Sequence, residues 1–173
     1  QQVVALITDI GNDIMYGVSA EEIIGGLKSL FRDLSELEAN IFITSIPIDL
    51  KKDVGEFYFR ILRQVFFRNS SVEYHQASEA VQMVNKFILQ SLKKNIIAIN
   101  GMKQFCGISK IHYSLFKSRS AWSHIAGNLT DTLNVNAPPK LNVSELVLSL
   151  ANNLARILFI DMLGIAKKNN ETF

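Results

Sequence analysis

The sequence has few of the residues that build disulfides and metal centres. It contains one cysteine, Cys106, and three histidines. One cysteine cannot form a disulfide within the chain, and three scattered histidines without matching cysteines make a poor zinc ligand set. We therefore expect neither a metal nor another cofactor. A single cysteine is also typical of a reducing compartment, which favours the cytoplasm.

The sequence also lacks an excess of either charge and any long apolar run. Its 18 basic and 16 acidic side chains give a formal net charge of +2. The basic residues are scattered in pairs such as Lys51-Lys52 and Lys93-Lys94, so we expect no nucleic-acid partner. No apolar stretch is long enough to span a bilayer, which predicts the absence of a transmembrane segment. Gln1-Gln2 leads directly into a strand-like run, and this start does not resemble a signal peptide.

What is present is enough apolar material for a core, with 48% hydrophobic and 20% charged residues. Runs rich in β-branched residues predict buried strands over 3–8, 41–46 and 95–100, with a short strand over 72–75. Apolar periodicity predicts helices between them, over 19–39, 53–67, 78–92, 118–126 and 142–166. Ser19 and Glu22 form a capping-box pattern at the start of the first of these helices. Gly127 is expected to close the helix over 118–126, and 101–116 reads as an irregular loop.

Four of the five predicted helices have an apolar stripe. In chain order, these stripes consist of Ile23, Leu27, Leu30, Leu34 and Leu37; Val54, Phe57, Ile61 and Val65; Val81, Val84, Ile88 and Leu92; and Leu146, Leu150, Leu154, Leu158 and Met162. The last helix is partly apolar on its other side too. It therefore either packs on the sheet between neighbours, forms a homodimer surface or contacts a membrane.

Strands that alternate with helices of this length predict a three-layer α/β/α fold with a parallel sheet. No repeat or linker divides the chain, so we expect one domain over residues 1–173. Because the sequence opens within a predicted strand, we expect this domain to be incomplete at its N-terminus.

Polar residues follow the predicted strands, where an open parallel sheet binds its ligands. They are Asp9, Gly11, Asn12 and Asp13 after the first strand, Ser45 and Asp49 after the second, and Asn100, Ser109 and His112 after the third. Asn12 and His112 are far apart in sequence, yet a parallel topology brings both to the same edge of the sheet.

Two of these segments resemble conserved blocks of the SGNH (GDSL-like) hydrolases. Gly11-Asn12-Asp13 is similar to the Gly-x-Asn-Asp block at the end of a central strand, without the intervening residue. The segment from Gly107 to Ser114 is similar to the Asp-x-x-His block in its position after the last strand. The order of elements over residues 1 to about 130 also matches. The resemblance implies a flavodoxin-like parallel sheet and hydrolysis of an ester, either a small ester, an acylated sugar or a lipid.

The resemblance assigns roles that suit this chemistry. The Asn12 side-chain amide would donate to the oxyanion formed from the ester carbonyl. His112 would be the general base for a serine, since imidazole can accept a proton at neutral pH. Gly11 would allow the tight turn that presents Asn12, and Asp13 would hold the loop. Met15 and Tyr16 either line the substrate pocket or pack beneath the loop.

The sequence departs from the family at two places. It contains no Gly-Asp-Ser block, so the nucleophile is expected upstream of Gln1. Ser109 occupies the acid position three residues before His112 and brings no negative charge. The alternative is therefore a non-catalytic α/β module that binds a ligand or a protein on the same fold.

Other candidates have simpler explanations. A flavodoxin or receiver domain is disfavoured, because there is no acidic pair after a first strand and no phosphate-binding loop. We expect His75 and His124 to be surface or packing residues. Cys106 lies between Phe105 and Gly107 without a nucleophile-elbow pattern, which favours a buried, unreactive thiol.

Overall fold

Three short parallel strands form the centre of the fold. The computed structural model describes residues 3–107, 110 and 112–135, and its strands are β1 (Val4–Ile7), β2 (Asn40–Thr44) and β3 (Ile96–Ile99). The strand order is β1-β2-β3. β2 is central and pairs in parallel with both neighbours, with Leu6 opposite Phe42 and Phe42 opposite Ile97. The three predicted main strands, their parallel direction and their side-by-side arrangement are therefore confirmed.

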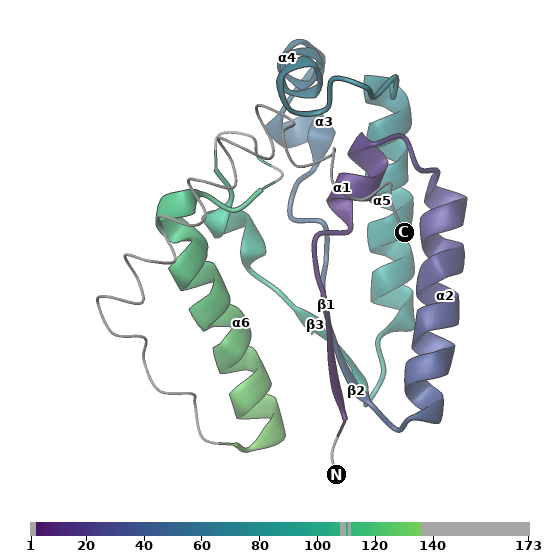
Figure 1. Cartoon of the computed structure of the whole chain (residues 1–173), viewed down its shortest axis with the longest axis vertical. Coiled ribbons are helices and arrows are strands. Elements are labelled where there is room, and N and C mark those ends of the chain that lie inside the picture. The colour runs from purple at the N-terminus through teal and green to yellow at the C-terminus, as the bar shows by residue number, and fades with distance from the viewer. Residues whose placement is uncertain (1–2, 108–109, 111, 136–173) are drawn as a thin grey trace, which may run out of the picture. The chain divides into compact units, whose positions relative to one another are not determined.

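Helices surround this sheet and its carboxyl-terminal edge. They are α1 (Gly11–Met15), α2 (Ala20–Glu36), α3 (Leu50–Asp53), α4 (Glu56–Phe66), α5 (Tyr74–Ser91) and α6 (Ser118–Leu133), with 3-10 turns η1 (Met102–Phe105) and η2 (Leu115–Lys117). Figure 1 shows α2 and α5 side by side on one face of the sheet and α6 on the other. No helix in the described part of the chain is both long and apolar enough to cross a membrane.

The chain divides into two compact units, Gln1–Asn134 and Val135–Phe173, and all the elements above belong to the first. Apart from Val135, the second unit lies outside the described residues. The helix predicted over 142–166, together with its homodimer surface, therefore also lies outside them.

The sheet has a separate apolar core on each face. On the first face, Ile41 and Ile43 of β2 pack with buried residues of α2 and α5. On the second, Phe42 and Ile99 pack with Met102, Ala121 and Ile125. Side chains of one strand alternate between the faces, so β2 contributes to both cores. The result is a mixed α/β fold with a parallel sheet between helices.

The start of α2 follows the prediction, but its buried stripe differs. The Glu22 amide donates to Ser19 Oγ (3.2 Å), and the Ser19 amide donates to Glu22 Oε2 (3.1 Å), which confirms the capping box. Leu30 and Leu37 were expected in the stripe but are exposed, whereas Phe31 is buried. Phe31 belongs to the same apolar face and reaches Phe87 of α5, with ring centroids 6.2 Å apart.

The region between β2 and α5 departs most from the expected structure. The helix predicted over 53–67 is found as α4, but the short helix α3 precedes it, and Gly55, with φ of 70°, separates the two. The expected stripe of α4 faces solvent: Phe57, Ile61 and Val65 are all exposed. Phe59 and Leu62 form the buried face instead.

Three further expectations were wrong. Residues 72–75 do not form a strand, because Tyr74 begins α5, where Glu73 and Gln76 form a capping box. Gly127 does not end α6, which continues to Leu133 and closes at Asn134 in the left-handed conformation (φ 52°). Residues 101–116 are not wholly irregular, since they contain η1 and the start of η2.

β1 was expected to be buried, but every second residue of it is exposed. Val4 and Leu6 point to the same face as Phe42, yet they are exposed where Phe42 is fully buried. Among the described strands, β1 pairs only with β2, so it is an edge strand. The core residues of α6 pack on Phe42 and Ile99 rather than on Val4 and Leu6.

Candidate functional site

A small cavity lies at the carboxyl ends of β1 and β2. Its lining comes from three segments of the chain: Asp9, Ile10, Gly11 and Asn12; Thr44, Ser45, Ile46, Pro47 and Ile48; and Tyr113. The volume is about 20 Å³, which is room for about one water molecule. A space of that size suits one polar atom, such as a carbonyl oxygen, rather than a whole substrate.

Asp9 and Gly11 shape the turn that brings Asn12 to this cavity. Asp9 follows β1 in the left-handed conformation, with φ of 60°. Asp tolerates this region better than most residues. The Asp9 carbonyl accepts a hydrogen bond from the Asn12 amide (3.1 Å), and α1 begins directly. Asn12 therefore lies in the first turn of a short helix, not in the loop expected from the sequence.

Gly11 is needed for space rather than for its backbone conformation. It lies outside the positive-φ region, contrary to the expectation that it makes the tight turn. A Cβ atom at Gly11 would lie 3.3 Å from Ile46 Cγ2, so a side chain there would crowd the wall of the cavity. The positive φ that the turn requires is at Asp9 instead.

Asn85 of α5 fixes the wall formed by the segment after β2. Its Oδ1 accepts a hydrogen bond from the Ile46 amide (2.8 Å), and its Nδ2 donates to the Ile46 carbonyl (3.0 Å). One side chain thus satisfies both backbone groups of a buried residue that lies outside the sheet.

The segment after η1 folds back on itself and carries His112 and Tyr113. The Gly107 amide donates to the His112 carbonyl (2.9 Å), and the Ser114 amide donates to the Phe105 carbonyl (2.9 Å). The exposed His112 ring is stacked on Phe67, with centroids 6.0 Å apart, and also lies near Phe66, at 6.4 Å. The next residue, Tyr113, lines the cavity together with Asn12.

The Tyr113 hydroxyl is kept in its neutral form. Burial raises the pKa of Tyr113 to about 12, and the negative charge of Asp9 adds to this effect. A hydrogen bond with the buried Thr44 side chain opposes it only partly. Tyr113 can therefore donate a hydrogen bond at the cavity throughout the neutral pH range.

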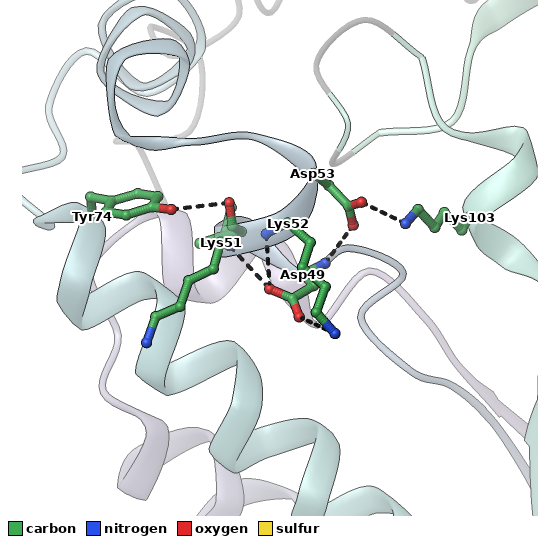
Figure 2. A network of polar contacts seen from close by, with 7 residues as sticks. Asp49, Lys51, Lys52, Asp53, Tyr74 and Lys103 are labelled. Atoms are coloured by element: carbon green, nitrogen blue, oxygen red, sulfur yellow. Dashed lines mark hydrogen bonds and ion pairs between the residues drawn. The ribbon is translucent and has the colours of Figure 1, made fainter.

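A polar network fixes the loops beyond β2 and β3 relative to each other (Figure 2). The Asp49 amide donates to Asp53 Oδ2 (2.8 Å), and Lys103 Nζ of η1 donates to Asp53 Oδ1 (2.6 Å). These bonds, led by the one from Lys103, lower the pKa of Asp53, which remains ionised. Asp49 also caps α3, and the Tyr74 hydroxyl donates to the Leu50 carbonyl (3.2 Å).

Among the described residues, the predicted site residues Asp13, Met15, Tyr16 and His112 do not line the cavity. Met15 is buried in the core, and Tyr16 is exposed with its ring against Phe67 (5.2 Å between centroids). The exposed Asp13 closes α1 with its carbonyl, which accepts from the Val18 amide (3.0 Å). Ser109, at the acid position, lies outside the described residues.

The other histidines and the cysteine have local partners. His124 bonds the Asn100 carbonyl through Nε2 (2.7 Å) and packs beside Phe105. His75 is an exposed residue of α5 that lies 3.5 Å from Glu79. Burial raises the pKa of the half-buried Cys106 thiol, so the nucleophilic thiolate is disfavoured.

The sequence did not single out Thr44 and Tyr113 as site residues. Both are polar groups at the cavity, Thr44 at the last position of β2 and Tyr113 directly after His112. Thr44 fell inside the strand predicted over 41–46 rather than at its end, and nothing in the sequence says that Tyr113 turns inward.

Comparison of the chain with protein-family models, with curated proteins and with solved structures found no match.

The raised pKa of Tyr113 can be measured directly. The difference between the alkaline absorbance titrations of the wild-type chain and of Tyr113→Phe isolates this phenol among the four tyrosines. We expect a midpoint near 12, above the ordinary value of 10. Because the folded pKa is the higher one, the stability linked to this group should be lost as the pH rises from 10 toward 12. A midpoint near 10 would mean that the phenol is not buried at the cavity.

Proposed function

We propose that this chain supplies the oxyanion donor and the general base of an SGNH-type ester hydrolase. One observation carries the proposal: the cavity at the end of the sheet is lined by Asn12 and also by Tyr113, the residue next to His112. The two segments that resemble conserved blocks of the family thus contribute to one small cavity. Its volume of about 20 Å³ suits the carbonyl oxygen of an ester, with the rest of the substrate outside.

The strand order supports a flavodoxin-like sheet of the kind that these hydrolases have. β1, β2 and β3 follow one another in space as they do in sequence, with parallel pairing throughout. That order is the one expected for half of a doubly wound sheet. In such a sheet, β1 would be a central strand, and its free edge would receive further strands.

In the proposed reaction, a serine oxygen attacks the carbonyl carbon of the ester. The serine proton passes to His112, and the electron pair of the C=O double bond moves to the oxygen, where the Asn12 amide stabilises the negative charge. His112 then protonates the leaving alcohol, and water releases the acyl group from the serine in the same way. Residues 1–173 contain no Gly-Asp-Ser block to provide this serine. The complete enzyme would be a natural protein that contains this sequence and also carries a serine nucleophile opposite Asn12.

The test of this proposal is to change Asn12 to alanine in that natural protein and to measure hydrolysis of p-nitrophenyl acetate. We expect kcat to fall about 10²-fold, with KM little changed, since the amide acts on charge that develops only in the transition state. The matched control is Asn69→Ala, an exposed asparagine in the turn after α4.

Two outcomes would contradict the proposal. An unchanged kcat in a folded Asn12→Ala variant would show that Asn12 is not the oxyanion donor. Natural protein without turnover, although it contains the Gly-Asp-Ser block, would favour the non-catalytic binding module. Turnover by the 173-residue chain alone would instead place the nucleophile within this sequence.

A further inference from the structure

The exposed face of α4 carries large apolar side chains. Phe57 is 80% exposed, Ile61 42% and Val65 55%, and they recur every fourth residue along one side of the helix. Phe66 (50%) and Tyr16 (66%) continue this apolar area at the end of the helix, where Tyr16 meets Phe67. We call Tyr16, Phe57, Ile61, Val65 and Phe66 the α4 surface.

The α4 surface is contiguous with the candidate site. The ring of Phe67, which directly follows α4, contacts both Tyr16 and His112, and Phe66 also lies beside His112. The same end of the molecule therefore presents the exposed apolar side chains and the exposed imidazole. Figure 1 shows α4 beyond the carboxyl ends of the strands, which is also the edge of the sheet where α1 follows β1.

Basic side chains outnumber acidic ones in the chain segments next to this apolar area. Residues 49–68 contain five basic and three acidic side chains, and residues 101–117 contain three basic and none that are acidic. Asp9 and Asp13 add two carboxylates near α1. These segments together are more positive than the whole chain, whose net charge is +2. Lys51, Arg68 and Lys110 are among the exposed cations there.

We propose that the α4 surface binds an anionic lipid surface. An amphipathic helix with exposed aromatic and aliphatic side chains and flanking Lys and Arg has the composition of a segment that lies in the headgroup region. Apolar side chains enter the acyl boundary while the cations meet anionic headgroups. We expect the exposed cations of these segments, such as Lys51, Arg68 and Lys110, to favour an anionic lipid layer over a neutral one. Binding does not depend on hydrolysis. The bound lipid layer would also present ester substrates to His112, and this part of the proposal rests on the proposed function.

The test is cosedimentation of the 173-residue chain with lipid vesicles. One set consists of phosphatidylcholine alone, and the other contains phosphatidylcholine and phosphatidylserine in a ratio of about three to one. We expect binding to the serine-containing vesicles that weakens when the salt concentration is raised, and much weaker binding to phosphatidylcholine alone.

The decisive variant is Phe57→Ser with Ile61→Ser, since both side chains are exposed and their loss leaves the core intact. We expect its affinity for the serine-containing vesicles to fall at least about tenfold, with an unchanged circular dichroism spectrum. The matched control is Leu37→Ser. Leu37 is similarly exposed but follows the end of α2, at the opposite edge of the sheet, and its variant should bind like the wild type.

Three outcomes would overturn the proposal: no vesicle binding by the wild-type chain, binding unaffected by the double substitution, or equal binding to both vesicle types. Self-association that the double substitution abolishes, without vesicle binding, would assign the α4 surface to a protein interface instead. If the chain binds vesicles but the natural protein has no esterase activity, the proposed lipid site is retained and the proposed hydrolase function is contradicted.

Discussion

Replacing Phe42 with alanine is expected to lower the free energy of unfolding by about 4 kcal/mol. Phe42 is the middle residue of the central strand and is fully buried. Its ring faces the smaller of the two cores, where it packs with Ile99, Ala121 and Ile125. Because the neighbouring side chains are held by the sheet and α6, small shifts fill the space left by the ring only in part. The loss should therefore be near the upper end of the usual range for phenylalanine.

Urea unfolding followed by far-UV circular dichroism measures this effect. Phe116→Ala is the matched control, because Phe116 is 93% exposed and its loss should change stability by less than about 0.5 kcal/mol. If Phe42→Ala does not fold, Phe42→Leu keeps most of the buried area and should cost about 1.5 kcal/mol. A Phe42→Leu variant as stable as the wild type would show that α6 does not pack on this face of the sheet.

The sequence was a good guide wherever local pattern and burial agree. The three main strands consist of short β-branched runs between polar ends, and each was found within a residue or two of its predicted position. The capping box of α2 was also predictable, because Ser19 and Glu22 interact with each other and need no tertiary partner.

The α4 region shows why periodicity alone can fail. Both sides of this helix are apolar, since Phe59 and Leu62 alternate with Phe57 and Ile61. A pattern of this kind predicts a helix but cannot say which side meets the core. Tertiary packing decides, and here it buries Phe59, whose ring meets Tyr74 (5.6 Å between centroids).

The site was predictable in outline and not in detail. Parallel strands bring their carboxyl ends to one edge, so the sequence predicts Asn12 and the segment of His112 at that edge, although Tyr113 rather than His112 lines the cavity with Asn12. The left-handed Asp9 and the inward Tyr113 depend on contacts with Asn12, Thr44 and their neighbours, which no local pattern records.

Changing His112 to alanine in a natural protein that carries the serine nucleophile is expected to lower kcat about 10⁴-fold. Without the imidazole, the serine would have no group to take its proton as it attacks the ester. Hydrolysis of p-nitrophenyl acetate under saturating substrate measures the effect. His75→Ala is the matched control, because His75 is an exposed residue of α5 whose nearest charged partner is Glu79, and its removal should leave kcat unchanged.

Rescue by free imidazole separates a proton acceptor from a residue that only supports the loop. The His112 ring is exposed and lies on Phe67, so its removal leaves a space beside an aromatic ring that solution imidazole can enter. Added imidazole should restore part of the activity of His112→Ala and none of the activity of Asn12→Ala, since an amide donor is not replaced by a base. If imidazole rescues neither variant while both remain folded, His112 is not the base.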